Sequence, residues 1–139
     1  MEKRKVQSVI FYCDAEGLKH FLLLRVNKKR GHFWQNCTGS VEDGETFKMG
    51  ALREAIEETN LSKDNIKIIT ETNMQFTFVD QWEHYVTEKV FFIHCEGFWD
   101  VKLDETEHSE FKWQVESYLD PTLLKYDSNR DALIKCLEI

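Results

Sequence analysis

Four ionisable residues fall within six positions of one predicted helix: Arg53, Glu54, Glu57 and Glu58. On a helix, residues three and four positions apart are neighbours, so the three carboxylates share one face. Like charges at this spacing repel, and the glutamates near the carboxyl end also oppose the helix dipole. A bound cation would reverse each of these unfavourable effects. Clustered carboxylates without cysteine or histidine are typical ligands of a hard ion such as Mg²⁺ or Mn²⁺.

The segment in front of the helix favours this interpretation over plain surface charge. An adjacent pair of glutamates on a surface helix is often only solvated. Here an aromatic, glycine-containing loop, FWQNCTGS at residues 33–40, leads into the helix. The loop and the helix together are therefore the first candidate for a site.

The helix itself is expected to begin near Thr46 and to end near Thr59. Asn60 then follows the last turn, where glycine and, next, asparagine are preferred because both tolerate a left-handed conformation. Gly50 and Ala51 are expected to leave room on the carboxylate face. The opposite, buried face is expected to carry Met49, Leu52, Ala55, Ile56 and Thr59.

The composition is that of an ordinary globular chain. Its 139 residues are 42% hydrophobic and 31% charged, with one proline and six glycines, so we expect a single domain over residues 1–139. The four cysteines stand far apart without a C-x-x-C pair, which favours free thiols in a reducing, cytoplasmic setting. The apolar run after the basic amino terminus is too short for a membrane span, so no membrane association is expected.

The net charge of −7 opposes a large nucleic-acid surface, and no stable nucleic-acid partner is expected. A small phosphorylated substrate is compatible with this charge, because bound ions and local lysine or arginine recruit it. The choice between a monomer and a homodimer stays open.

Hydrophobic patterning predicts strands around the helix. Residues 6–12 and 20–26 are expected to form a hairpin. Further strands are expected at residues 66–70, 74–79, 87–95 and 111–115, with an acidic loop at 100–110.

Two later signals predict helix starts. Asp120-Pro121 places proline at a first helical position, and residues 126–129 offer an amino-terminal cap for a final helix at about 129–137. The helices do not alternate regularly with the strands. This order favours an α+β fold with a mixed sheet between helices over a doubly wound parallel sheet.

Residues 39–61 resemble the Nudix box, G-x5-E-x7-R-E-U-x-E-E-x-G-U, in which U is apolar. Gly39, Glu45 and the pairs at 53–54 and 57–58 match it, and the single departure is Asn60 in place of the second glycine. The resemblance implies a Nudix-type α/β/α sandwich. It also implies Mg²⁺-dependent hydrolysis of a nucleoside diphosphate linked to another group.

Shorter matches resemble the dATP / dihydroneopterin triphosphate pyrophosphatase branch of this family. They are Phe33-Trp34-Gln35, Thr38-Gly39-Ser40, Thr106-Glu107-His108, Phe111-Lys112-Trp113 and Ser128-Asn129-Arg130. The branch implies an enzyme that cleaves a (deoxy)nucleoside triphosphate or dihydroneopterin triphosphate to the monophosphate and diphosphate, with Mg²⁺ or Mn²⁺ as cofactor.

The resemblance also assigns roles around the metal. Glu45 and Arg53 are expected to orient the ligands, although Arg53 is equally interpreted as a simple partner of Glu57. Glu107, in the acidic loop, resembles the carboxylate outside the box that completes the site, and such an acidic run is also typical of solvated surface. Either Glu107 or Glu54 is the general base. The expected metal ligands are Gly39, through its carbonyl, with Glu54, Glu57, Glu58 and Glu107.

Candidate substrate contacts come from cations and aromatic residues. Arg25, Lys5 and Arg4 lie on the first two strands and are candidates for phosphate binding. Gln35 is a candidate to read a base or pterin edge, whereas Trp34 is interpreted either as a contact beside it or as core.

Two further segments stay open as substrate contacts. The basic loop at 27–32 is a candidate for phosphate, or is simply solvated. Phe78, Trp82 and Tyr85 either stack on a ring or belong to the core.

Three alternatives remain for the function. One is a Nudix hydrolase of another substrate, namely a nucleotide sugar, a dinucleoside polyphosphate or an RNA 5′ end. A second is a non-catalytic nucleotide-binding module, which conflicts with the full set of carboxylates. A third is an acidic Ca²⁺-binding protein, which conflicts with the absence of a D-x-D-x-D-G loop.

Overall fold

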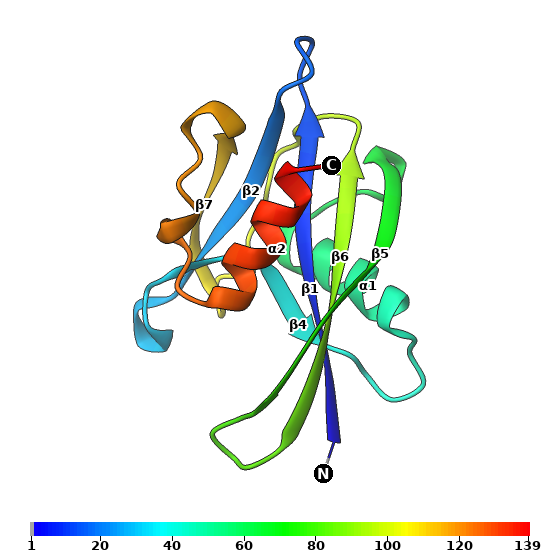
Figure 1. The fold of residues 1–139 in the computed structure, drawn as a ribbon, viewed down its shortest axis with the longest axis vertical. Coiled ribbons are helices and arrows are strands. Elements are labelled where there is room, and N and C mark those ends of the chain that lie inside the picture. Colours follow the sequence, from blue (N-terminus) through cyan, green and yellow to red (C-terminus); the bar gives the residue numbers. More distant parts are fainter. Residues whose placement is uncertain (1) are drawn as a thin grey trace.

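β1 (Glu2–Cys13) is the central strand of a seven-stranded mixed sheet that lies between two α-helices (Figure 1). The structure, a computed structural model, describes residues 2–139. The expected mixed sheet between helices is confirmed. The other elements are β2 (Lys19–Val26), β3 (Trp34–Gln35), β4 (Cys37–Ser40), α1 (Phe47–Thr59), β5 (Ile66–Val79), β6 (Tyr85–Cys95), β7 (His108–Val115) and α2 (Asp127–Leu137).

The sheet divides along β1. This strand runs parallel to β6 and antiparallel to β2 and β4. It pairs with β2 only near its carboxyl end, where Phe11 lies opposite Phe21, and with β4 nearer its amino end, where Val6 lies opposite Gly39. β2 continues beyond this point with β7 and the short β3 as its partners. The chain at 34–40 therefore crosses from β2 to β1 where the two strands diverge.

Asn36, the residue between β3 and β4, holds this crossing in place. Its buried side-chain amide donates to Oε1 of Gln7 on β1 (2.8 Å) and to the backbone carbonyl of Asn129 on α2 (3.2 Å). Its backbone N–H donates to Oδ1 of Asn129 (2.8 Å). Buried polar groups are stable only when they are paired, so this network fixes the crossing against both neighbours. Gln35 and Gly39, on either side of it, are positioned by the same contacts.

Alternating residues of the central strands supply two separate cores. Val9 and Phe11 of β1 face α2 and pack with its buried Leu133. Ile10 points the other way, into the core that includes Ala55 of α1. This alternation is the expected result of the two-residue period of a strand that is covered on both faces.

Several expected boundaries shift in the structure. The loop expected at 33–40 contains the two short strands β3 and β4, and the two strand segments expected at 66–79 form one irregular strand, β5. The last strand begins at His108 rather than residue 111, because it pairs with β2 up to Val26. Asp120-Pro121 starts only a single 3-10 turn, and α2 begins at Asp127 without a side-chain cap.

The expected buried face of α1 is corrected by the structure. Met49 was expected in the core but is 53% exposed, whereas Gly50 and Ala51, expected beside the carboxylates, are buried. Ala51 packs against Val6 and Phe91 of the sheet, whereas Gly50 lies against the loop before the helix. Met49, Leu52 and Ile56 instead line a shallow depression on the outer side of the helix.

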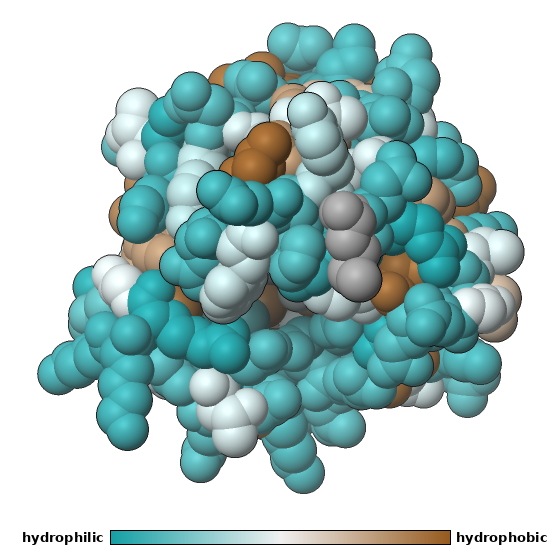
Figure 2. Space-filling view, turned by 90° about the horizontal axis from the view of Figure 1, so that it is seen from below, coloured by the Kyte–Doolittle hydropathy of each residue, from teal (hydrophilic) through white to brown (hydrophobic). Residues whose placement is uncertain are grey.

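The surface at the end of the molecule seen in Figure 2 is mostly hydrophilic, with only small, separate apolar areas. No helix within residues 2–139 is long and apolar enough to cross a membrane.

Candidate active site

α1 has the ends that its sequence predicts. The Thr46 hydroxyl accepts a hydrogen bond from the Met49 N–H (3.1 Å), which satisfies one of the free donors of the first turn. Asn60 adopts the left-handed conformation (φ 62°, ψ 25°), and its N–H donates to the Ile56 carbonyl (2.9 Å). Asparagine therefore serves in the position where the motif has glycine, and the helix that carries the carboxylates is well defined.

Gly39 of β4 lies directly against the Glu54 side chain. A methyl group at Gly39 would overlap with the carboxyl carbon of Glu54, so only glycine allows this approach. Glu54 is largely buried here, and burial raises the pKa of its carboxyl. The close contact between β4 and α1 thus places a carboxylate beside the backbone of the crossing segment.

Arg53 connects this helix to the preceding loop. Its guanidinium donates twice to the Glu45 carboxylate (2.8 and 3.0 Å) and once to the Ser40 carbonyl (2.8 Å). It also donates to Glu54 (3.0 Å) and Glu57 (3.1 Å). The expected simple pair with Glu57 exists, but it is one contact of several. The hydrogen bonds from Arg53 to Glu45 lower the pKa of Glu45 to about 2.

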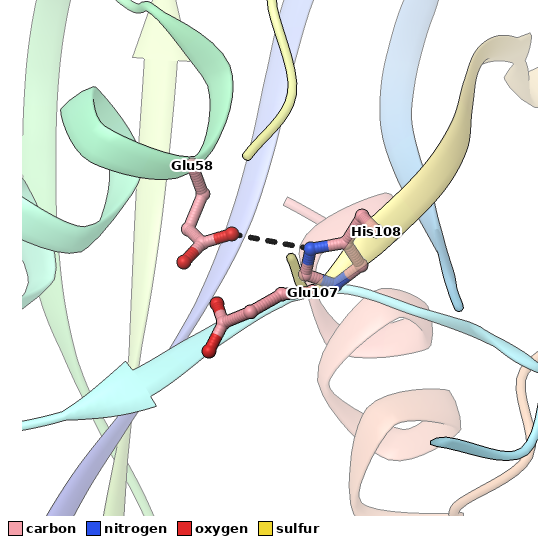
Figure 3. A group of neighbouring side chains, drawn as sticks. All are labelled: Glu58, Glu107 and His108. Atoms are coloured by element: carbon pink, nitrogen blue, oxygen red, sulfur yellow. Dashed lines mark hydrogen bonds and ion pairs between the residues drawn. The ribbon is translucent and has the colours of Figure 1, made fainter. Parts of the chain in front are cut away.

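Glu58, Glu107 and His108 form a close cluster in the site (Figure 3). Glu58 comes from α1, whereas Glu107 and His108 lie at the start of β7. One ligand atom from each of the three lies within 4.8 Å of the other two. Nδ1 of His108 is 3.1 Å from Oε2 of Glu58, and both side chains are almost fully buried.

The two carboxyl groups of this cluster shift each other's pKa. A hydrogen bond with Glu58, together with burial, raises the pKa of Glu107 to about 7. Burial also raises the pKa of Glu58 and lowers that of His108, so the imidazole is neutral. A cation bound between two such carboxylates would stabilise the charged form of both.

A tight turn holds Glu107 in position. The N–H groups of Glu107 and His108 both donate to the Asp104 carbonyl (3.0 Å each), and Asp104 Oδ1 accepts from Thr106. The Glu107 carbonyl in turn accepts from the N–H of Asn27 (3.0 Å), next to the end of β2. The acidic run is therefore an ordered loop that is tied to the sheet.

A cavity of about 450 Å³ opens beside these carboxylates, which is within the usual range for small-molecule sites. Lys5 and Arg30 contribute positive charge to its wall. Arg30 belongs to the basic loop at 27–32, and its guanidinium lies 3.5 Å from the Glu107 carboxylate. The other lining residues are Val26, Gln35, Thr38, Gly39, Ser40, Glu54, Glu107 and His108.

Three of the candidate substrate contacts do not line this cavity. Arg4 donates to the backbone carbonyls of Glu45 (2.7 Å) and Glu42 (3.0 Å). Arg25 donates to the His32 carbonyl (3.1 Å), and Trp34 packs against the core on the α2 side. Of the five candidate substrate contacts, Lys5 and Gln35 line the cavity. Arg4, Arg25 and Trp34 instead contact other parts of the fold.

The candidate stacking residues are also absent from the cavity wall. Phe78, Trp82 and Tyr85 are exposed near the turn between β5 and β6. The Nζ of Lys3 lies 5.2 Å above the centre of the Trp82 ring. Neither a core position nor a contact with the cavity is found for these three.

His108 is a site residue that the sequence shows only as part of the Thr106-Glu107-His108 match, without a role of its own. The five histidines of the chain have no H-x-x-x-H spacing that would mark one of them as a metal ligand. The sequence feature that could have identified it is its position, because it directly follows Glu107 and is the first residue of β7.

The residues present fit a hard divalent cation. Oxygen donors converge from α1 and from the loop before β7, and the buried glutamates beside them have raised pKa values that a cation would lower. Gly39 keeps its backbone against Glu54, where any side chain would fill the space. Carboxylate and carbonyl oxygens of this kind suit Mg²⁺ or Mn²⁺.

Residues 3–134 match the NUDIX domain, and the chain belongs to the Nudix family. It is a Nudix hydrolase, an enzyme acting on phosphoric anhydride bonds. The fold is the family's α/β/α sandwich.

Individual relatives agree with this assignment. The chain is 29% identical over 140 residues to the dihydroneopterin triphosphate diphosphatase of Escherichia coli K12, covering 94% of this chain and 91% of that protein. The solved E. coli dihydroneopterin triphosphate pyrophosphohydrolase has a TM-score of 0.79 at 24% identity, covering 97% of this chain and 94% of that one. A C. elegans Ap4A hydrolase complex has a TM-score of 0.77 at 25% identity, covering 96% and 94%.

Proposed function

We propose that this protein is a Mg²⁺-dependent pyrophosphohydrolase that cleaves a (deoxy)nucleoside triphosphate or dihydroneopterin triphosphate to the monophosphate and diphosphate. The observation that carries the proposal is the meeting of carboxylates and cations in one cavity. Glu54 and Glu107 line it together with Lys5 and Arg30. The similarity to dihydroneopterin triphosphate diphosphatases supports the choice of substrate class.

The proposed metal ligands are the carboxylates of Glu54, Glu57, Glu58 and Glu107, with the carbonyl of Gly39. These residues would hold a divalent ion, Mg²⁺ or Mn²⁺, which would supply positive charge to the phosphate oxygens and would lower the pKa of the attacking water. Arg53 acts by orientation, because its five donors hold Glu54 and Glu57 against Glu45 and the backbone of Ser40.

Lys5 and Arg30 are the proposed phosphate contacts. Both line the cavity, and Arg30 lies 3.5 Å from Glu107 with a side chain that is more than half exposed. A bound polyphosphate would compete with Glu107 for this guanidinium. Arg30 therefore has the position and the freedom to exchange one anion for the other.

Glu107 is the proposed general base. Its carboxylate lines the cavity, and about a third of its side chain is exposed there, so it can take a proton from a water molecule beside the substrate. Glu54, the other candidate, already accepts a hydrogen bond from the Arg53 guanidinium at 3.0 Å. This contact holds the Glu54 carboxylate in place, and its side chain is less exposed than that of Glu107.

A dinucleoside polyphosphate is the second candidate substrate, because the fold and 25% of the aligned residues also agree with an Ap4A hydrolase. The proposed setting is a cytoplasmic, small-molecule enzyme of one domain over residues 1–139.

A substrate panel tests the proposal directly. Values of kcat/KM with Mg²⁺ are compared for dihydroneopterin triphosphate, dATP, dGTP, Ap4A, ADP-ribose and 5′-triphosphate RNA. The proposal predicts the highest value for one of the small triphosphates. Preferred turnover of Ap4A would select the second candidate, and turnover of ADP-ribose alone would contradict both.

A further inference from the structure

A chain of three buried or half-buried side chains connects the metal carboxylates to the substrate cavity. Oε2 of Glu58 lies 3.1 Å from Nδ1 of His108, and Nε2 of His108 lies 3.0 Å from the amide nitrogen of Gln35. The three residues come from α1, β7 and β3, which are distant in sequence. Figure 3 shows the first of these contacts, with the imidazole turned towards the Glu58 carboxylate.

The direction of each hydrogen bond follows from the carboxylate. A carboxylate that is to hold a cation is ionised, so Glu58 only accepts and Nδ1 of His108 must carry the proton. The amide nitrogen of Gln35 lies 3.0 Å from Nε2 of His108, so Nε2 is the acceptor of this contact and Nδ1 carries the N–H of the ring. The group of Gln35 that faces it must be the NH₂, because the amide carbonyl would place two acceptors together.

This orientation leaves one atom of Gln35 free. Gln35 lines the cavity, and its carbonyl oxygen Oε1 makes no hydrogen bond within residues 2–139. Among the described side chains, the one buried polar atom without a partner is Oδ1 of Asn36, so Oε1 of Gln35 is accessible to solvent. An amide with a fixed orientation and a free carbonyl in a binding cavity is a specific acceptor.

We propose that Glu58 and His108 lock the Gln35 amide so that its carbonyl oxygen accepts a hydrogen bond from a donor group on the substrate. The inference rests on the proposed function, since it concerns the substrate of the same cavity. It makes Gln35 a specificity-determining residue and His108 a positioning residue. The ligand class is therefore a phosphorylated compound that presents an amino, ring N–H or hydroxyl donor to this wall.

A structural role alone would predict something different. If His108 served only to fill the interior, any substitution that preserved packing would leave substrate preference unchanged. If Gln35 were free to rotate, it would offer its NH₂ or its carbonyl with equal ease, and substrates with donors or acceptors would bind alike. The lock predicts a one-sided preference for donors.

The first test reads the tautomer of His108 without any turnover. The full chain, labelled with ¹⁵N in histidine and loaded with Mg²⁺, is observed by NMR, and H108N identifies the resonance. We expect a proton on Nδ1 and an unprotonated Nε2. A proton on Nε2 would overturn the proposal even if the enzyme is the proposed pyrophosphohydrolase.

The second test removes donors from the substrate one at a time. In the adenine series, kcat/KM is compared for ATP, dATP, 3′-deoxy-ATP and purine riboside triphosphate, with wild type and Q35L. One missing donor should lower kcat/KM about 10- to 100-fold for wild type. For Q35L, removal of the same donor from the substrate should change kcat/KM by no more than about threefold. Equal ratios in the two proteins, or no donor effect in wild type, would overturn the proposal.

The third test separates the two contacts of His108. The side-chain NH₂ of asparagine can replace Nδ1, so H108N keeps the donor to Glu58 but loses the contact with Gln35. Mn²⁺ binding measured by electron paramagnetic resonance should stay within about threefold in H108N and weaken about 10- to 100-fold in H108A. H108N should also lose the donor preference. Retention of that preference would overturn the lock, and H108N supplies this result even if H108A does not fold.

Discussion

Glu58 and Glu107 are identical side chains with different tasks, and their surroundings explain the difference. Glu58 is almost fully buried and accepts from His108, whereas about a third of the Glu107 side chain is exposed to the cavity. The two share a hydrogen bond that raises the pKa of Glu107 to about 7. At the scale of single residues, Glu58 is held in place by burial and by His108, whereas Glu107 is open to the cavity and has a raised pKa.

The raised pKa of Glu107 predicts how stability depends on pH. The folded-state pKa of Glu107 is raised from about 4.5 to about 7, so between these values the native protein holds a proton that the unfolded chain has lost. Its contribution to stability is complete below about pH 4.5 and is lost as the pH rises through 7. In EDTA, thermal denaturation should show wild type losing stability from pH 5 to 8 relative to Glu107→Gln.

Mg²⁺ should suppress this loss of stability, because a cation bound between Glu58 and Glu107 would replace the proton that Glu107 holds in its absence. Parallel curves for wild type and Glu107→Gln over this range would contradict the assignment of the pKa shift to Glu107.

Glu58→Gln tests the fixed carboxylate. The amide keeps the shape of the side chain but removes the charge, so we expect kcat/KM to fall about 100-fold or more. Circular dichroism and the thermal midpoint should stay close to those of wild type. The matched control is Glu16→Gln, on the exposed turn between β1 and β2, which should leave activity unchanged. Turnover of Glu58→Gln within threefold of wild type would contradict the metal assignment.

At the scale of elements, the site depends on how closely β4 and α1 approach each other. Gly39 on β4 and the small residues Ala51 and Ala55 on α1 make the contact possible. The helical wheel predicted a different buried face because it weighs apolar character rather than size. The carboxylates therefore lie at the border of the buried face.

Gly39→Ala should disturb this contact selectively. The new methyl group would overlap with the Glu54 carboxyl, so we expect a loss of about 1–3 kcal/mol in the free energy of unfolding and a clear loss of activity. Gly97→Ala is the matched control, because a methyl group there meets no atom within 4 Å. Urea denaturation and kcat/KM measure both effects. Equal behaviour of the two variants would show that the close approach is not required.

The end of α1 gives an independent prediction. Asn60 has a φ of 62°, a conformation that costs an ordinary residue about 1–2 kcal/mol. Asn60→Ala should therefore lower the free energy of unfolding by about this amount, whereas Asn60→Gly, which restores the motif, should lower it by less than about 0.5 kcal/mol. A neutral Asn60→Ala in urea denaturation would contradict the cap assignment.

The elements that could be predicted from the sequence are those whose bounds are set by residues close to them in the chain. The bounds of α1 followed from Thr46 and Asn60, whose effects lie within a few residues of the helix ends. β3 and β4 were missed because their pairing partners, β2 and β1, set their conformation. The role of His108 also depends on a long-range pairing, since β7 brings it beside a helix fifty positions earlier.

At the scale of the whole molecule, the division of the sheet creates the cavity. β1 and β2 diverge, the chain at 34–40 crosses between them, and the loop before β7 closes the side near β2. The motif in α1 is contiguous and could be identified from the sequence. The remaining walls, Lys5, Arg30, Gln35 and Glu107, come from four separate segments, and local patterns do not fix their distances.

This arrangement also explains why candidate cations differ in their use. Arg4 and Lys5 are adjacent on β1, so their side chains point to opposite faces. Arg4 binds the carbonyls of the loop before α1, and Lys5 lines the cavity. The two-residue period of a strand predicts that Arg4 and Lys5 point to opposite faces of the sheet. It does not predict which of the two faces the cavity.

The central claim is that a divalent cation held by these carboxylates directs cleavage to release diphosphate. The most direct measurement is the product ratio from the preferred triphosphate, with Mg²⁺, by ion chromatography in wild type and Glu58→Gln. We predict monophosphate and diphosphate in equal amounts for wild type, and loss of both products on addition of EDTA or in Glu58→Gln. Release of orthophosphate in place of diphosphate, or full turnover in EDTA, would contradict the account.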